Sequence, residues 1–160
     1  MSFIKKAFIQ HEDVSALNTP ASREHKMLHP KLQKISSITK SKNVDLGGFD
    51  LEEQPDHLFV KAFAIKSNEV NDNGDAFSED ALKKATETFI GCPVFVNHQN
   101  DDVEKARGIV VHAWYDEDKK GIYVINRVDK KAYPRLARGI EENIIIGTSM
   151  GCQVAYSICS

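Results

Sequence analysis

The sequence has few cysteines and lacks the marks of several protein classes. Among its 160 residues are only Cys92, Cys152 and Cys159, with no closely spaced pair. That pattern argues against a disulfide framework and favours a reducing, cytoplasmic setting. No four ligands for zinc cluster along the chain, so we expect no metal site and no cofactor. No apolar run is long enough to cross a membrane.

An excess of charge of one sign is missing too. The formal net charge is −2 and charged residues make up 28% of the chain, so nothing indicates a general binder of nucleic acids. The first 13 residues contain no long apolar core and no small-residue cleavage motif, unlike a secretion signal. The length is enough for one domain with a hydrophobic core.

Two regions differ in composition. Residues 1–48 carry scattered lysines and the polar run SSITKSKN, without a sustained strand or helix period. This composition predicts a basic, partly flexible N-terminal arm that ends at Gly47-Gly48. We expect residues 49–160 to form the folded domain.

Periodicity predicts an α+β fold with a mainly antiparallel sheet. Alternating apolar residues predict strands over 57–65, 108–115 and 121–128, the last two joined by a charged hairpin turn. Another short strand is predicted over 93–98, before these two strands in the chain. Helices are expected from Ser78 to Gly91, with Ser78 as cap, and from Asp129 to Gly139, with Asp129 as cap and Pro134 in the first turn or at a kink.

The longest apolar stretch is NIIIGTSMGCQVAYSI, Asn143–Ile158. It predicts a buried strand that bends at the small residues between Gly147 and Gly151. Glycines on either side of Ser149 would let another backbone approach closely, which makes Ser149 a candidate nucleophile. Taken alone, the stretch favours the alternative of a buried strand with one satisfied serine.

A serine nucleophile needs a base, because its hydroxyl is protonated at neutral pH. Of six histidines, His98 is the best candidate, since it stands where a short apolar strand meets a polar loop. The alternative is a loop histidine bonded to Asp101 or Asp102. His112 lies inside a strand and is expected to be a half-buried structural residue.

Three segments, taken in order, resemble the prohead (capsid-maturation) serine proteases of tailed bacteriophages, which share their fold with herpesvirus assemblins. They are residues 71–100, ARGIV at 106–110 and GTSMGC at 147–152. The most specific matches are a G-x-P-V…H strand end, with its histidine at His98, and an S-M-G strand at 149–151. The resemblance covers Leu58 to the C-terminus and leaves out the arm.

The resemblance implies a barrel-like sheet, with His98 as general base and Ser149 as nucleophile. Gly151 lies in the region expected to provide an oxyanion donor. In this family the third catalytic member usually follows the nucleophile strand, so we expect this chain to be truncated at its C-terminus. Asp101, Asp102 and Glu104, in the loop after His98, are the candidates for that role within the chain, and the sequence does not select among them.

Some members of the family cut after patterns like Leu/Ile-x-Glu. Leu51-Glu52-Glu53 and Ile140-Glu141-Glu142 match this pattern. Glu53 and Glu142 are therefore candidate self-cleavage positions, and charged surface turns are the alternative.

The resemblance implies a serine endopeptidase that cleaves phage scaffold and major capsid precursor proteins, and itself, inside the assembling prohead in the host cytoplasm. It also leaves room for a homo-oligomer, with no membrane or nucleic-acid partner. One alternative is a catalytically incomplete scaffold or head-assembly protein that keeps the protease fold. Another is a serine hydrolase with a different substrate.

Overall fold

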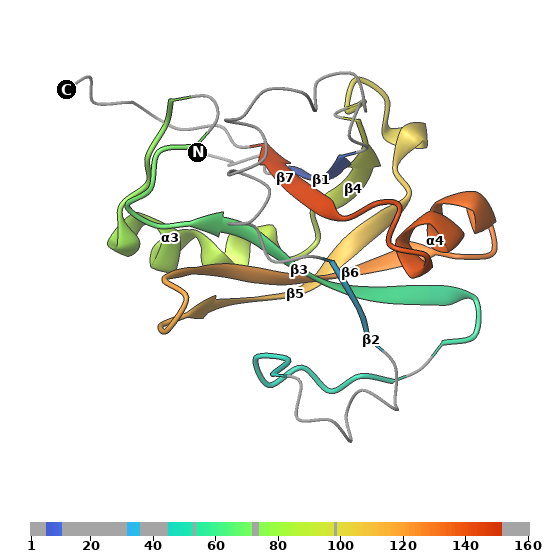
Figure 1. Cartoon of the computed structure of the whole chain (residues 1–160), viewed down its shortest axis with the longest axis horizontal. Coiled ribbons are helices and arrows are strands. Elements are labelled where there is room, and N and C mark those ends of the chain that lie inside the picture. The colour runs from blue at the N-terminus through green and yellow to red at the C-terminus, as the bar shows by residue number, and fades with distance from the viewer. Residues whose placement is uncertain are drawn as a thin grey trace.

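A curled, mainly antiparallel sheet organises the chain (Figure 1). The computed structural model describes residues 6–10, 32–35, 45–52, 54–71, 74–97 and 99–151. The strands are β1 (Lys6–Gln10), β2 (Gln33–Ile35), β3 (His57–Lys66), β4 (Pro93–Val96), β5 (Gly108–Asp116), β6 (Gly121–Asp129) and β7 (Gly147–Gly151). The helices are α3 (Glu79–Ala85) and α4 (Pro134–Glu141), with 3-10 turns η2 (Thr86–Phe89) and η3 (Val103–Lys105).

The strand order is β2-β3-β6-β5-β4-β1-β7. Strands β3, β6, β5 and β4 pair antiparallel and form a half-barrel, and the β1–β4 pair is parallel. The sheet curls so far that β7 reaches β3, where the Thr148 hydroxyl donates to the Phe63 carbonyl at 3.2 Å. The α+β class with a mainly antiparallel sheet is confirmed.

The hydrophobic core fills the inside of this curl. Alternation along β6 turns Ile122, Val124 and Val128 inward, where each is fully buried. Helices α3 and α4 lie near opposite ends of the sheet in Figure 1, and Leu82 and Ile140 join them to the core. On the other face of β3 and β6, a smaller cluster forms under residues 45–51 (Leu46, Leu51, Phe59 and Ile125).

Local signals placed several elements correctly. Strands β3, β5 and β6 and the charged hairpin turn match the prediction, and the Asp116 carboxylate accepts from the Asp118 and Lys119 amides within that turn. The Ser78 hydroxyl caps α3 by accepting from the Ala81 amide at 3.3 Å. At the end of η2, Gly91 has φ +83°, which favours glycine.

The predicted helix from Asp129 to Gly139 is wrong at both ends. Proline is favoured at the first helical position because it lacks an amide hydrogen, and α4 begins at Pro134. Asp129 instead accepts from the Ala132 amide in the preceding turn. Gly139 lies inside the helix, where an added Cβ would meet Ile145 at 3.1 Å.

The predicted strand over Asn143–Ile158 is shorter in the described residues. Asn143 has φ +56° and ends α4 in the left-handed region, so the isoleucines turn instead of extending. Ile144 is 61% exposed, while Ile145 is buried beside Gly139. The strand is Gly147–Gly151, and residues 152–160 lie outside the described part of the chain.

Two pieces of the predicted arm belong to the sheet. Strand β1 pairs with both β4 and β7, and β2 pairs with β3. The remaining residues up to 44, except Leu32, lie outside the described ranges. Cys92 is a buried free thiol whose sulfur donates to the Thr88 carbonyl, and the other two cysteines are not described. None of the described helices has the length and hydropathy that a membrane crossing requires.

Candidate functional site

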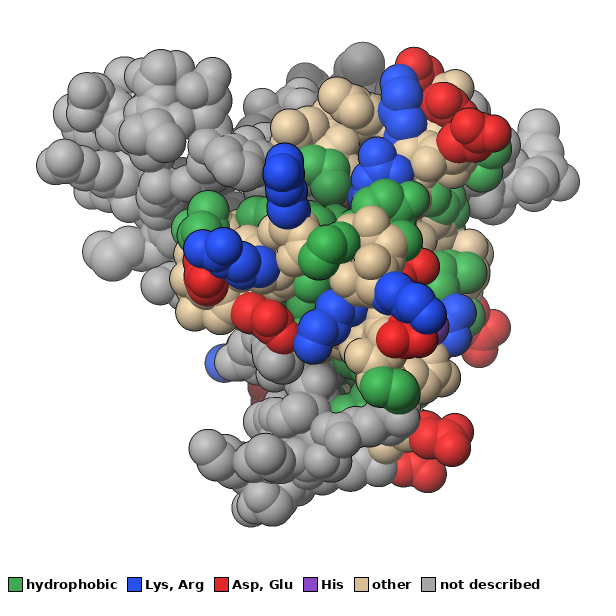
Figure 2. Space-filling view, turned by 90° about the vertical axis from the view of Figure 1, so that its right-hand side faces the viewer, with side chains coloured by type: hydrophobic (Ala, Val, Ile, Leu, Met, Phe, Trp, Pro, Cys, Tyr) green, Lys and Arg blue, Asp and Glu red, His purple; other side chains and the backbone are tan. Residues whose placement is uncertain are grey.

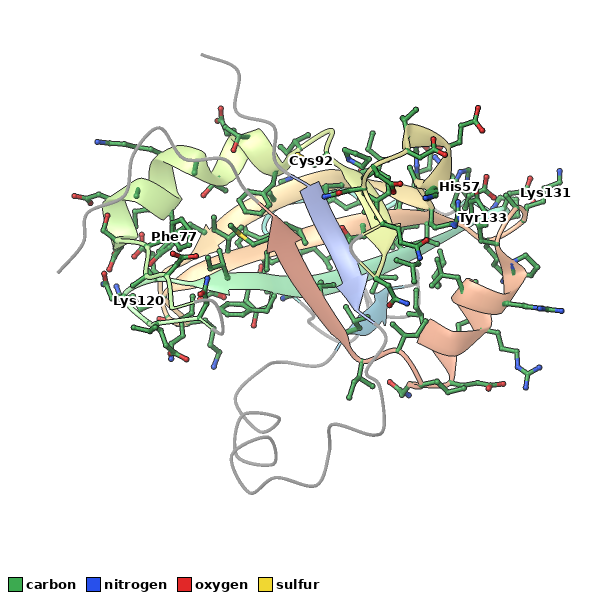
Figure 3. All side chains as sticks on the ribbon, turned by 90° about the horizontal axis from the view of Figure 1, so that it is seen from above. His57, Phe77, Cys92, Lys120, Lys131 and Tyr133 are labelled. Carbon is green, nitrogen blue, oxygen red and sulfur yellow. The ribbon has the colours of Figure 1, made fainter. Side chains whose placement is uncertain are left out.

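The strand that carries Ser149 and the strand that leads to His98 belong to one region of the sheet. Strand β1 lies between β4 and β7, and its register connects them in rows. Phe8 pairs with Phe95 on one side and with Ser149 on the other. Two strand spacings amount to about 10 Å. Figure 3 shows β7 and β1 side by side across the sheet. The backbone of Ser149 is therefore near the strand that leads to His98, with one strand in between.

Strand β7 is held by the residues on either side of Ser149. Thr148 bonds to Phe63 on β3, and Met150 packs against the main core. An added Cβ at Gly147 would have no described atom within 4 Å, so the expected close approach of another backbone is not found there. Gly151, the candidate oxyanion residue, ends β7 opposite Lys6.

His98 lies outside the described residues, and its pairing with Ser149 stays a prediction. Its neighbours show that the chain turns at the end of β4. Asn97 has φ +53°, and the Gln99 amide donates to the Val96 carbonyl at 3.2 Å. The sequence predicts the base at the point where a short strand meets a polar loop, and the residues on either side of His98 form such a strand end.

Two of the three candidate acids have local partners in the loop after β4. Asp102 caps η3 by accepting from the Glu104 amide at 2.9 Å. Asp101 forms an ion pair with Lys105, with 3.0 Å between Nζ and Oδ1. Both carboxylates thus order the loop that follows His98. The assignment of a third catalytic member to either one stays a prediction.

His112 has a structural role, as expected. Its ring stacks with the rings of Phe49 and Trp114, whose centroids are 5.5 and 5.7 Å away. Its Nε2 is 2.9 Å from the Gly47 carbonyl oxygen. A carbonyl only accepts, so this contact places a proton on Nε2. The bond holds residues 45–51 against the sheet.

The candidate self-cleavage segments are partly buried. Leu51 is 6% exposed and Ile140 is 4% exposed, and Ile140 lies within α4. Glu142 is at the surface, where its carboxylate accepts from Arg138 Nε at 2.7 Å. Glu53 lies outside the described residues. Because a protease grips an extended chain, cutting at either place requires the buried residue to leave its pocket first.

A buried lysine was missed by the sequence analysis. Lys61 on β3 is 9% exposed, and its ammonium donates to the Asp45 carbonyl at 2.6 Å. The same ammonium lies 4.9 Å from the Trp114 ring centroid and 4.3 Å from that of Tyr123. Burial lowers the pKa of Lys61, and the charges of Asp45 and Asp116 oppose this shift. The available sequence signal was that Lys61 alternates with Phe59 and Phe63 on one face of the strand.

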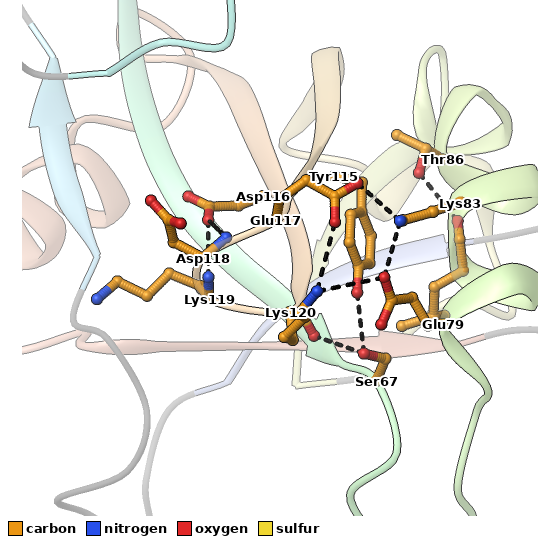
Figure 4. Close-up of polar contacts among 11 residues, drawn as sticks. Ser67, Glu79, Lys83, Thr86, Tyr115, Asp116, Glu117, Asp118, Lys119 and Lys120 are labelled. Carbon is orange, nitrogen blue, oxygen red and sulfur yellow. Dashed lines mark hydrogen bonds and ion pairs between the residues drawn. The ribbon is translucent and has the colours of Figure 1, made fainter.

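A second polar cluster joins the β5–β6 hairpin to α3 (Figure 4). The Lys83 ammonium lies 2.7 Å from both Glu79 and Glu117, and the hydrogen bonds that it donates to these carboxylates raise its pKa. The Ser67 hydroxyl donates to the Lys120 carbonyl at 2.9 Å and lies 3.0 Å from the Tyr115 hydroxyl. Ser67 is only 4% exposed, which suits a structural hydroxyl better than a nucleophile.

Charge is distributed evenly over the face shown in Figure 2. Lysines and arginines are interspersed there with aspartates and glutamates, and no patch of one sign dominates the described residues on this face. The same part of the chain holds no group of three or more histidine, cysteine or acidic side chains arranged to bind a metal. Comparison with protein-family models, curated proteins and solved structures gives no match.

Proposed function

We propose that this chain is a serine endopeptidase of phage head maturation, with a herpesvirus-protease-like version of the observed sheet. Ser149 is the nucleophile and His98 the general base, which takes the hydroxyl proton as the serine attacks the scissile carbonyl. The substrates are scaffold and major capsid precursors inside the assembling prohead in the host cytoplasm, and the chain itself. Its partners include further copies of the same chain.

The observation that carries this proposal is the backbone register. Ser149 and the last residues before His98 lie in one sheet, separated by β1 alone. The two motifs of the resemblance are 51 positions apart in the sequence, and the fold brings their strands together. His112, inside β5, forms a hydrogen bond with the Gly47 carbonyl.

A fluorophosphonate probe tests the nucleophile directly, because it reacts with an activated serine. We expect the probe to label Ser149 in the native chain and to leave Ser149→Ala unlabelled. Removing the base in His98→Gln should slow precursor cleavage about 10³-fold or more. His57→Gln is the matched control, since His57 begins β3 and is not assigned to the site. Equal precursor cleavage by the native chain and Ser149→Ala would refute the proposal.

One observation favours the alternative of a scaffold or head-assembly protein that keeps the fold without a complete site. Strand β1 fills the space between the two strands that would carry the catalytic pair. If the probe labels no serine and purified precursors stay intact, while the chain still binds the scaffold, the assembly role replaces the enzyme. Labelling of Ser149 without any cut in the precursors indicates a hydrolase with a different substrate.

A further inference from the structure

Strand β1 is paired along both of its edges by strands that come much later in the chain. Three of its residues pair with β4 in parallel, Ala7 to Ile9. All five pair with β7 in antiparallel fashion, from Lys6 opposite Gly151 to Gln10 opposite Gly147. Without β1, the facing edges of β4 and β7 would be unpaired rows of amides and carbonyls. Such edges accept an added strand.

Both neighbouring strands have anchors that do not involve β1. Strand β7 is tied to β3 through Thr148, and the Ile146 carbonyl accepts from the Leu32 amide at 3.2 Å. Strand β4 pairs with β5, and the Val94 carbonyl accepts from the Arg107 amide at 2.7 Å. The two sides of the space are therefore each held by contacts that do not involve β1.

The chain after β1 is long enough for β1 to leave the sheet. Residues 11–31, 21 in number, separate β1 from the next described residue, Leu32. Fully extended, they span about 70 Å. One of the two ladders that hold β1 is parallel, which is slightly weaker per residue than an antiparallel ladder. A five-residue strand held by these two ladders can exchange with another extended segment.

We infer that the space between β4 and β7 is an acceptor site for one extended peptide strand, and that β1 is its intramolecular occupant. The ligand class is an extended peptide that pairs its backbone antiparallel to β7. Because this pairing passes Ser149, β1 competes with the precursor substrate and holds the enzyme in a closed state. The link with catalysis rests on the proposed function, whereas the strand exchange does not.

A proline in β1 tests the exchange in the full chain. Phe8→Pro removes one amide hydrogen and disfavours the strand, whereas the control Phe8→Val keeps the amide and the strand preference. A fluorescein-labelled peptide with the sequence of residues 1–12 is the probe, and fluorescence polarisation measures its binding. If β1 occupies the site in 90–99% of native molecules, Phe8→Pro should bind the peptide about 10- to 100-fold more tightly than the native chain. A peptide that carries proline at position 8 should not bind.

Failure of the inference differs from failure of the proposed function. A Phe8→Pro chain that keeps native circular dichroism but binds the peptide no better than Phe8→Val overturns the inference. Faster fluorophosphonate labelling of Phe8→Pro than of the native chain supports the inhibitory role of β1. Peptide binding without labelling of any chain leaves the acceptor site in place and removes the proposed catalysis.

Hydrogen exchange on the native chain provides a second measurement in case Phe8→Pro does not fold. If β1 leaves by local opening, the amides of residues 6–10 exchange faster than the amides of the central strand β6. Equal protection of the two strands would mean that β1 leaves only on global unfolding, and it would overturn the inference.

Discussion

Asn126 should limit the stability of this fold. It lies on β6 with 0% exposure, between Val60 on β3 and Val110 on β5. Neither its side-chain nitrogen nor its side-chain oxygen has a hydrogen-bond partner within the described part of the chain. An amide buried without a partner costs about 1–3 kcal/mol. Its replacement by an apolar side chain should therefore raise the free energy of unfolding.

Asn126→Val removes the amide and matches the valines around it, and valine is well suited to a strand. We expect a gain of about 1–2 kcal/mol in the free energy of unfolding, reduced where the new methyl groups fit imperfectly. For a chain of this size, that gain raises Tm by about 2–4 °C for each kcal/mol. Asn126→Leu keeps the branching at Cγ and tests whether the site tolerates more volume. Asn126→Asp is the opposite control, because it adds a buried charge and should destabilise by several kcal/mol.

Urea denaturation followed by tryptophan fluorescence provides the measurement. The chain has a single tryptophan, Trp114, which stacks on Tyr123 at 5.4 Å on the other face of the sheet. Trp114 fluorescence therefore reports unfolding of the sheet and is not changed directly by the substitution, because Trp114 does not face the side chain at position 126. If the free energy of unfolding falls by more than about 1 kcal/mol in both Asn126→Val and Asn126→Leu, while its slope against urea concentration is unchanged, the expected gain in stability is refuted. That result would mean that the Asn126 side-chain amide has hydrogen-bond partners in solution and that the loss of these bonds lowers the stability.

Three further substitutions test other parts of the fold. Gly108→Ala should lower the free energy of unfolding, measured by urea denaturation, by about 3 kcal/mol or more. The added Cβ would lie 2.2 Å from the Arg127 carbonyl oxygen, so the backbone would have to shift. A loss of under about 1 kcal/mol would contradict this prediction. Ser78→Ala should lower the free energy of unfolding by about 1 kcal/mol, because it removes the cap of α3. Ser78→Asp should restore this stability, since aspartate also caps helices. An unchanged urea midpoint in Ser78→Ala would be evidence against the cap. The folded chain holds the pKa of Lys61 below its usual 10.5, so the unfolded chain binds more protons just below that pH. The stability of the native chain relative to Lys61→Met should therefore rise as the pH rises toward 10.5, and a flat or falling difference in thermal melts at stepped pH would exclude the shift.

The parts of the fold that sequence predicted are those set by neighbouring residues. The β5–β6 hairpin needs alternating apolar residues and a turn of short polar ones, and all of them lie within residues 108–129. The α3 cap needs Ser78 and the amide three residues later. Such contacts close over a few residues, so their signals stand together in the chain. The error at α4 shows the limit of this logic, because two rules competed and the proline rule was stronger than the aspartate cap.

The isoleucine run shows a different limit. Three β-branched residues in sequence are typical of a buried strand, and this preference led the prediction. Asn143 adopts a left-handed conformation directly before them, which ends α4 and turns the chain. Ile145 then packs on Gly139 while Ile144 faces solvent. Helix packing, which the local pattern does not contain, decided the conformation.

Lys61 was missed for a related reason. A lysine within an alternating strand is normally on the solvent face, since lysine is rarely buried without a partner. Here residues 45–51 cross that face and supply the Asp45 carbonyl as acceptor, with two aromatic rings beside the ammonium. This covering segment lies at the end of the region predicted to be an arm. The environment of Lys61 therefore depends on a contact across 16 residues that no strand pattern records.

The candidate site also depends on a contact between segments that are far apart in the chain. The motifs that suggest catalysis stand on β4 and β7, and the domain predicted from them begins after residue 48. In the structure these two strands do not pair with each other, because residues 6–10 lie between them and pair with both. A five-residue strand needs no distinctive pattern of its own when two preformed edges supply its hydrogen bonds. The segment with the weakest sequence signal thus lies directly beside Ser149 in the sheet, where the proposed function would give it control over access to that residue. Any mechanism assigned to this chain must therefore include residues 6–10.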